Sequence, residues 1–249
     1  MKKLILLLFT IPFLAIGQEK GISFEHNTTW AKVKAKAKAE KKHIFVDAFT
    51  TWCGPRKWMA ANVFPEEHVG TFFNENFVNL KIQMDETAED NADVKSWREE
   101  AKRFAKDYKI AAYPTFLIFD PNGELVHRIV GGGEADQFIA LAKEGLDPNT
   151  QYETLVKKFN ANPTDKAIAR STAKAAVKAY DRDLTAKAVE SVINNSTADE
   201  LLENETLKLV SQNIGKPGSK AFSTILANKE KVDAKLGAGK TDELLSVSI

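Results

Sequence analysis

The stretch that most constrains this chain joins a buried strand to a helix through a cysteine. Residues 43–49 form a short, mostly apolar run, which is typical of a strand covered on both faces. Cys53 follows, and residues 58–61 continue with good helix formers. The pattern therefore places Cys53 at a helix N-terminus, where free backbone N–H groups and the helix dipole favour the thiolate, the reactive form of cysteine.

The order of predicted elements indicates one mixed sheet with helices on both faces. A helix is expected before the Cys53 strand, and Pro65 interrupts the helix after it. Residues 77–85 alternate between apolar and polar, which favours a second strand, and a helix with apolar residues at helical spacing follows. The turn at residues 120–123 joins a strand hairpin. The predicted ranges are helix 30–42, strand 44–49, helix from 53, strand 77–85, helix 94–108, strands 116–119 and 124–130, and helix 134–144.

The loop around the cysteine resembles the active-site loop of the thioredoxin family, Trp-Cys-Gly-Pro-Cys-Lys. Here the loop consists of Trp52, Cys53, Gly54, Pro55, Arg56 and Lys57, so Arg56 stands where the family has its second cysteine. The resemblance extends over about residues 24–146 and implies the thioredoxin fold, an α/β fold in which helices flank a mixed sheet.

The resemblance also implies roles for residues outside the loop. Asp47 lies where thioredoxins bury an acid beneath the active-site cysteines, and Lys81 matches the lysine paired with that acid. Burial raises the pKa of a carboxylic acid, so Asp47 is expected to assist proton transfer; an acid merely capped by backbone at a strand end is the alternative. Pro114 matches the family's cis-proline, and Tyr113 before it is expected to pair with substrate peptide like an added strand.

Arg56 leaves the mechanism open. Cys53 is the only cysteine, so no intramolecular disulfide can form and no second thiol can resolve a mixed disulfide. Arg56 either holds a positive charge near Cys53, or points to solvent beside a degraded site, or replaces the cysteine of a Cys-Gly-Pro-Cys parent.

The first residues resemble a secretory signal peptide. Lys2 and Lys3 precede an apolar run that is interrupted by Thr10 and Pro12, and residues 15–17 are suited to cleavage near Gly17. We predict a signal peptide over residues 1–17 and a bacterial, periplasmic or secreted protein without stable membrane insertion after cleavage; an uncleaved anchor or a cytosolic N-terminus is the alternative. The single cysteine does not follow the cleavage site, which argues against a lipid anchor.

After residues 147–149 the composition changes to helix-spaced apolar residues with helix breaks near 162, 194–197 and 215–218. We predict a thioredoxin-like domain over residues 18–148 and an all-α domain over residues 149–249, without a convincing helical-repeat consensus.

Two functions remain open. One is thiol–disulfide exchange through Cys53, with polypeptide thiols or disulfides as substrates and a reducing protein or small thiol as partner. The other is a redox-inactive module that binds peptides around Pro114 and contacts partners through its helices. The net charge of +1 gives no support for nucleic-acid binding. The four histidines are scattered and no nucleotide-binding loop occurs, so neither a metal nor a cofactor is expected.

Overall fold

The computed structural model describes residues 20–246 of the chain. The predicted signal peptide, including Lys2 and Lys3, lies outside the described residues. Among the described residues, no helix is both long and apolar enough to cross a membrane.

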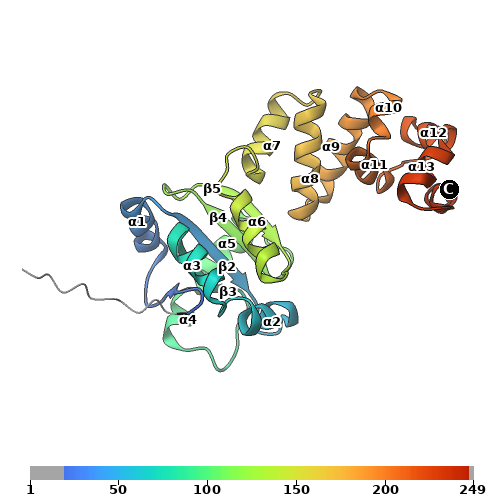
Figure 1. The fold of residues 1–249 in the computed structure, drawn as a ribbon. Helices are drawn as coiled ribbons and strands as arrows, with labels where there is room; N and C mark the ends of the chain where they lie inside the picture. Colours follow the sequence, from blue (N-terminus) through green and yellow to red (C-terminus); the bar gives the residue numbers. More distant parts are fainter. Residues whose placement is uncertain (1–19, 247–249) are drawn as a thin grey trace, which may run out of the picture.

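A five-stranded mixed sheet forms the centre of the first half (Figure 1). The strand order is β1-β3-β2-β4-β5. Strands β1, β3 and β2 run parallel to one another, β4 runs antiparallel to β2, and β5 runs antiparallel to β4. The strands are β1 (Phe24–Glu25), β2 (His43–Phe49), β3 (Phe77–Gln83), β4 (Thr115–Phe119) and β5 (Leu125–Val130). In the central strand β2, Asp47 lies beside Lys81 of β3 and Phe116 of β4.

Helices cover both faces of this sheet, as the sequence predicts. One core contains residues of α1 (Trp30–Glu40) and α5 (Arg98–Asp107). The opposite core contains residues of α2 (Gly54–Asn62), α3 (Glu67–Asn76) and α6 (Ala135–Glu144). In the second core, Phe45 of β2 packs against Phe73 and Phe138 with ring centroids 4.8 and 6.0 Å apart. These aromatic contacts contribute beyond area burial and hold α3 and α6 against the sheet.

The predicted helix over residues 94–108 is two helices in the structure. The short α4 (Ala92–Ser96) ends at Trp97, and α5 begins directly after it. The backbone at Trp97, with φ −92° and ψ −1°, departs from regular helical values and separates the two helices, and its side chain is buried in the sheet core.

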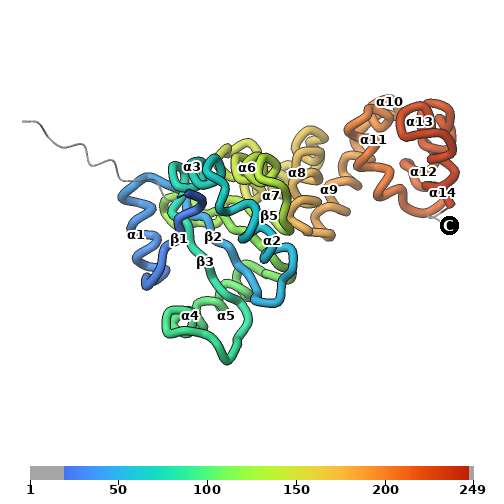
Figure 2. Tube along the Cα trace, turned by 60° about the horizontal axis from the view of Figure 1, so that its bottom comes forward, coloured from blue at the N-terminus to red at the C-terminus, as the bar shows by residue number. Residues whose placement is uncertain are grey.

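The second half is entirely helical and extends away from the sheet domain (Figure 2). Most of its buried residues form a core of their own, in which Ala173 and Val192 pack with Leu207 and Ile225. The helices are α7 (Tyr152–Ala161), α8 (Lys166–Lys178), α9 (Arg182–Asn195), α10 (Ala198–Leu201), α11 (Asn204–Ser211), α12 (Lys220–Ala227), α13 (Lys229–Leu236) and α14 (Lys240–Ser246).

The two halves meet where α7 packs beside β5. The backbone N–H of Tyr152 donates to Nδ1 of His127 at 3.1 Å, and the Gln151 side chain donates to the Gly145 carbonyl at 3.0 Å. Lys178 and Glu144 form an ion pair across the same junction. The predicted boundary after residue 148 falls in the turn between α6 and α7 and remains a prediction.

His127 makes this junction sensitive to acid. Burial, aided by the Lys178 charge, lowers the pKa of His127 from 6.5 to about 4. Because the pKa of His127 is lower in the folded than in the unfolded chain, the unfolded chain binds the proton more readily between pH 6.5 and pH 4. The free energy of unfolding therefore keeps its full value above pH 6.5 and decreases as pH falls towards 4. Only the neutral ring can accept the Tyr152 N–H through Nδ1.

We therefore expect the unfolding free energy to fall by about 2–3 kcal/mol between pH 7 and pH 4.5 through this residue alone. Urea unfolding of the wild type and of His127→Gln at both pH values measures the contribution. The variant should lose less stability over this interval by that amount. Equal losses in the two proteins would rule His127 out as the titrating group.

Candidate active site

The structure places Cys53 at the carboxyl end of β2, as the N-cap residue of α2. Its carbonyl accepts the Lys57 N–H at 3.1 Å, and Pro55 lies in the first turn, where a missing N–H costs nothing. The residue is only 3% exposed, whereas the neighbouring Trp52 is 68% exposed. The predicted cysteine at a helix N-terminus is therefore present, but its side chain is covered.

Asp85 fixes the loop that carries the cysteine. Its carboxylate accepts the Thr51 N–H at 2.9 and 3.1 Å and also the Thr51 hydroxyl. Neither residue was predicted from the sequence as part of the site. The available signal was an acid two residues after strand β3, which ends at the same sheet edge as β2 because the two strands are parallel.

In the acidic segment after β3, Glu86 and Glu89 are exposed, whereas Asp90 is held by internal contacts. The Asp90 carboxylate accepts from the Gln83 side chain at 2.8 Å and from the Thr87 N–H at 2.9 Å, and it pairs with Arg98. Its side chain is 4% exposed. Within residues 20–246, no group of three or more His, Cys, Asp or Glu side chains is arranged to hold a metal ion.

The Tyr113–Pro114 bond is cis, as the resemblance implies for Pro114. Pro114 is buried, and its carbonyl accepts the Gly131 N–H at 2.9 Å. The Tyr113 ring meets Trp52 edge-on, with centroids 6.0 Å apart, so the cis-proline loop contacts the cysteine loop. Burial raises the pKa of the Tyr113 hydroxyl, and the Asp85 charge adds to this.

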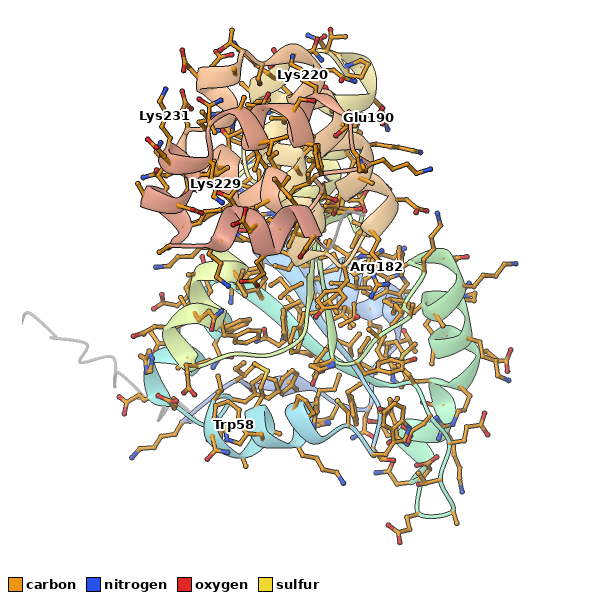
Figure 3. All side chains as sticks on the ribbon, turned by 90° about the vertical axis from the view of Figure 1, so that its right-hand side faces the viewer. Trp58, Arg182, Glu190, Lys220, Lys229 and Lys231 are labelled. Atoms are coloured by element: carbon orange, nitrogen blue, oxygen red, sulfur yellow. The ribbon has the colours of Figure 1, made fainter. Side chains whose placement is uncertain are left out.

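A shallow cavity of about 440 Å³ lies beside the cysteine loop. Pro55 and Trp58 of α2 line one side, and Gly132, Gly133 and Gln137 line the other. Trp58, labelled on α2 in Figure 3, is 43% exposed. Exposed aromatic surface next to a cavity suits contact with an apolar side chain of a ligand.

Arg56 points inward and binds Asp47. Its Nε and Nη2 atoms both donate to Oδ2 of Asp47, at 3.0 and 2.9 Å. The guanidinium lies 4.0 Å from the Phe49 ring centroid and its side chain is 14% exposed. The alternative in which Arg56 points to solvent is therefore wrong: a charge-assisted pair occupies the space beneath the loop.

Asp47 is completely buried, and its Oδ1 has no hydrogen-bond partner in the structure. Burial raises the pKa of this carboxyl group, while the charges of Arg56 and Lys81 oppose the rise. A guanidinium remains charged at any pH of interest, so it stabilises the ionised carboxylate at 2.9 Å.

Lys81 lies next to Asp47 in the register of β2 and β3 but forms no ion pair with it within 4 Å in the described part of the chain. Its Nζ lies 5.0 Å from the centroid of the Phe24 ring instead. Burial lowers the pKa of Lys81, and repulsion from Arg56 lowers it further. The structure thus brings Asp47, Arg56 and Lys81 together, with Arg56 as the direct partner of the acid.

Comparisons with known proteins agree with this architecture. A family model described as a thioredoxin-like domain matches residues 30–146. Thioredoxin H2-1 of Oryza sativa subsp. japonica is 32% identical over 124 residues, which cover 48% of this chain and 76% of that protein. Thioredoxin-2 of Pyricularia oryzae is 33% identical over 106 residues, 43% of this chain and 51% of that protein. The chain therefore belongs to the thioredoxin-like family.

The match has a limited extent. The chain spans about half the length of the Pyricularia oryzae protein and of Thioredoxin Y of Oryza sativa, 51% and 53% respectively. Among solved structures, that of a candidate disulphide isomerase from Bacteroides thetaiotaomicron is 35% identical and covers 52% of this chain and 97% of that one, with a TM-score of 0.43. This chain is thus a thioredoxin-like protein with one cysteine and a helical C-terminal region.

Proposed function

We propose that the protein carries out thiol–disulfide exchange through Cys53 alone, on polypeptide disulfides outside the cytoplasm. The Cys53 thiolate attacks one sulfur of a substrate disulfide, a Cys53–substrate disulfide forms, and the second substrate sulfur leaves as a thiolate. An external thiolate then attacks the substrate sulfur and returns Cys53 as a thiolate. Each step exchanges one disulfide for another, so no further oxidant is needed.

The observation that carries this proposal is the position of Cys53 at the N-terminus of α2, next to Trp52, whose ring contacts Tyr113 of the cis-proline loop. Asp85 fixes the loop that leads to Cys53 through its bonds to Thr51. Tyr113 and Pro114 are proposed to receive the substrate peptide, and the cavity at Trp58 to receive one of its apolar side chains.

We assign Asp47 and Arg56 a joint role. In a two-cysteine site, a buried acid beneath the loop is free to move a proton. Here Arg56 occupies its Oδ2 oxygen, so we propose that Asp47 positions the Arg56 guanidinium one helical turn from Cys53. Lys81 adds a second cation at the same sheet edge.

A second candidate is a redox-inactive peptide-binding module. The low exposure of Cys53 and the engagement of Asp47 with Arg56 favour it, because exchange needs an accessible sulfur. Under this alternative, Trp52, Trp58 and Tyr113 bind peptide and Cys53 has no chemical role.

Reaction with oxidised glutathione separates the two candidates. We expect the native protein to gain one glutathione on Cys53, measured as the mass of the intact protein, and dithiothreitol to remove it. Cys53→Ser should gain none, because it retains the fold but lacks the nucleophile. Modification of the wild type only after unfolding in guanidinium would instead show a thiol that is inaccessible in the native state and would support the binding module.

A further inference from the structure

A second cavity lies at the junction of the two halves, far along the chain from Cys53. It has a volume of about 550 Å³, within the usual range for small-molecule sites, and such sites often form between domains. Lys109 and Arg128 line it from the sheet half, and Arg182 and Lys187 from the helical half. Figure 3 shows Arg182 where the helical half meets the sheet half.

The cations of this cavity are not neutralised by ion pairs. Among residues 20–246, none of the four forms an ion pair within 4 Å, and Arg128 donates a hydrogen bond from its Nη2 to the Tyr108 carbonyl. Two lining carboxylates are present. Asp181 is already engaged, because it accepts the Leu184 N–H at 2.9 Å and the Tyr152 hydroxyl at 2.7 Å.

The other nearby carboxylates only partly offset the positive charge. Asp183 lines the cavity as its second acid, and Glu153 lies close enough to interact with Arg128 and Lys109. Burial raises the pKa of Glu153, while the charges of Arg128, Lys157 and Lys109 oppose the rise. Four cations and two carboxylates therefore line the cavity.

Two lining residues adopt an unfavourable backbone conformation. Lys109 and Tyr180 have φ values of 47° and 56°, and each follows the end of a helix, where glycine is preferred. Only Asn27 and Lys41 share this property among the non-glycine residues described. Both Lys109 and Tyr180 direct a large side chain to the same cavity although a glycine would suit the backbone better.

We propose that this cavity binds a small organic anion with an apolar body, of the kind formed by an alkyl chain or ring bearing a carboxylate or phosphate. Arg128 and Arg182 would pair with the anionic head, since guanidinium groups suit both oxyanions. Val156, Phe159 and Leu184 supply an apolar wall, and the Tyr180 ring, 67% exposed, covers the body of the ligand. The site is independent of Cys53 and of the exchange reaction.

Binding of the fluorescent anion 8-anilinonaphthalene-1-sulfonate to the full chain tests this site. We expect saturable binding that octanoate and octyl phosphate displace, the relative potency of the two identifying the preferred head group. Arg128→Met and Arg182→Met should each weaken the dissociation constant about tenfold or more, as loss of a charge-assisted hydrogen bond implies.

Glycine substitutions provide a control against loss of folding. Tyr180→Gly and Lys109→Gly should leave the melting temperature unchanged or raised, because they relieve the positive φ, yet should weaken probe binding. Lys41→Gly is the matched control: Lys41 has a φ of 55° at the end of α1, remote from the cavity, so binding should be unaffected. Absence of saturable binding, or equal affinity in the wild type, Arg128→Met and Tyr180→Gly, would overturn the proposal.

Discussion

Arg56→Cys is expected to raise the disulfide reductase activity of this protein roughly tenfold or more, because it supplies the resolving thiol that the wild type lacks. In the wild type, the Cys53–substrate disulfide waits for an external thiol. With a cysteine at position 56, one helical turn from Cys53, the second thiol breaks the mixed disulfide within the same molecule. Turnover of insulin reduction by dithiothreitol measures the gain.

Arg56→Ser is the matched control for this gain. It removes the guanidinium from Asp47 to the same extent but adds no thiol, so its activity should stay at or below the wild-type level. An inactive Arg56→Cys protein that is still folded would mean that the site has lost more than its second cysteine, and the binding-module alternative would be preferred.

The second large effect concerns stability. Arg56→Met should lower the free energy of unfolding by about 3–5 kcal/mol at neutral pH, because it leaves the Asp47 carboxylate buried without its direct partner. Methionine retains apolar contact with Phe49 and Phe64. The loss of unfolding free energy therefore measures the missing charge more than the missing packing. Urea unfolding monitored by tryptophan fluorescence gives the value.

The double variant Asp47→Asn/Arg56→Met should recover most of this loss, since replacing both members of a buried pair is often nearly neutral. The pH dependence provides a second check. A carboxyl group whose folded-state pKa is raised loses stability as pH rises through that pKa. The deficit of Arg56→Met should therefore be larger at pH 8 than at pH 5, and the double variant should show no such difference. A pH-independent deficit would place its origin in packing.

Much of the sheet half could be predicted because its local and long-range signals agree. The short apolar run of β2 matches its burial, and the Asp120–Gly123 turn closes the β4–β5 hairpin. In β3 the predicted apolar positions are buried, but the alternation is incomplete, because Asn79 is buried as well. The residues around Pro114 carry enough of the family pattern for the cis bond to be expected, and the structure confirms it.

The direction of the Arg56 side chain could not be predicted from the sequence. A position in the first turn of α2 allows a side chain either to reach solvent or to turn under the helix. The choice depends on Asp47, which lies nine residues earlier on β2, and on the Phe49 and Phe64 rings. The Thr51–Asp85 contact is likewise a loop-to-loop contact between segments 34 residues apart.

The spacing of apolar residues also failed to predict where one helix divides into two and where the helical half contacts the sheet half. Trp97 continues the helical spacing of residues 94–108, but its backbone departs from regular helical values and separates α4 from α5. In the helical half, the apolar spacing predicts helices, while the contact of Tyr152 with His127 depends on how α7 meets β5. The spacing of apolar residues within a helix does not indicate how that helix packs against a separate sheet domain.

The lifetime of the mixed disulfide tests the central claim that Cys53 exchanges disulfides without a resolving partner. A peptide bearing an activated disulfide is mixed with the native protein, and intact mass is followed with time before and after glutathione is added. We expect the wild-type adduct to persist until glutathione releases it. The Arg56→Cys adduct should decay unaided, leaving an internal disulfide between positions 53 and 56. Failure of the native wild type to form any adduct on Cys53, or release of the peptide without added thiol, would contradict the account.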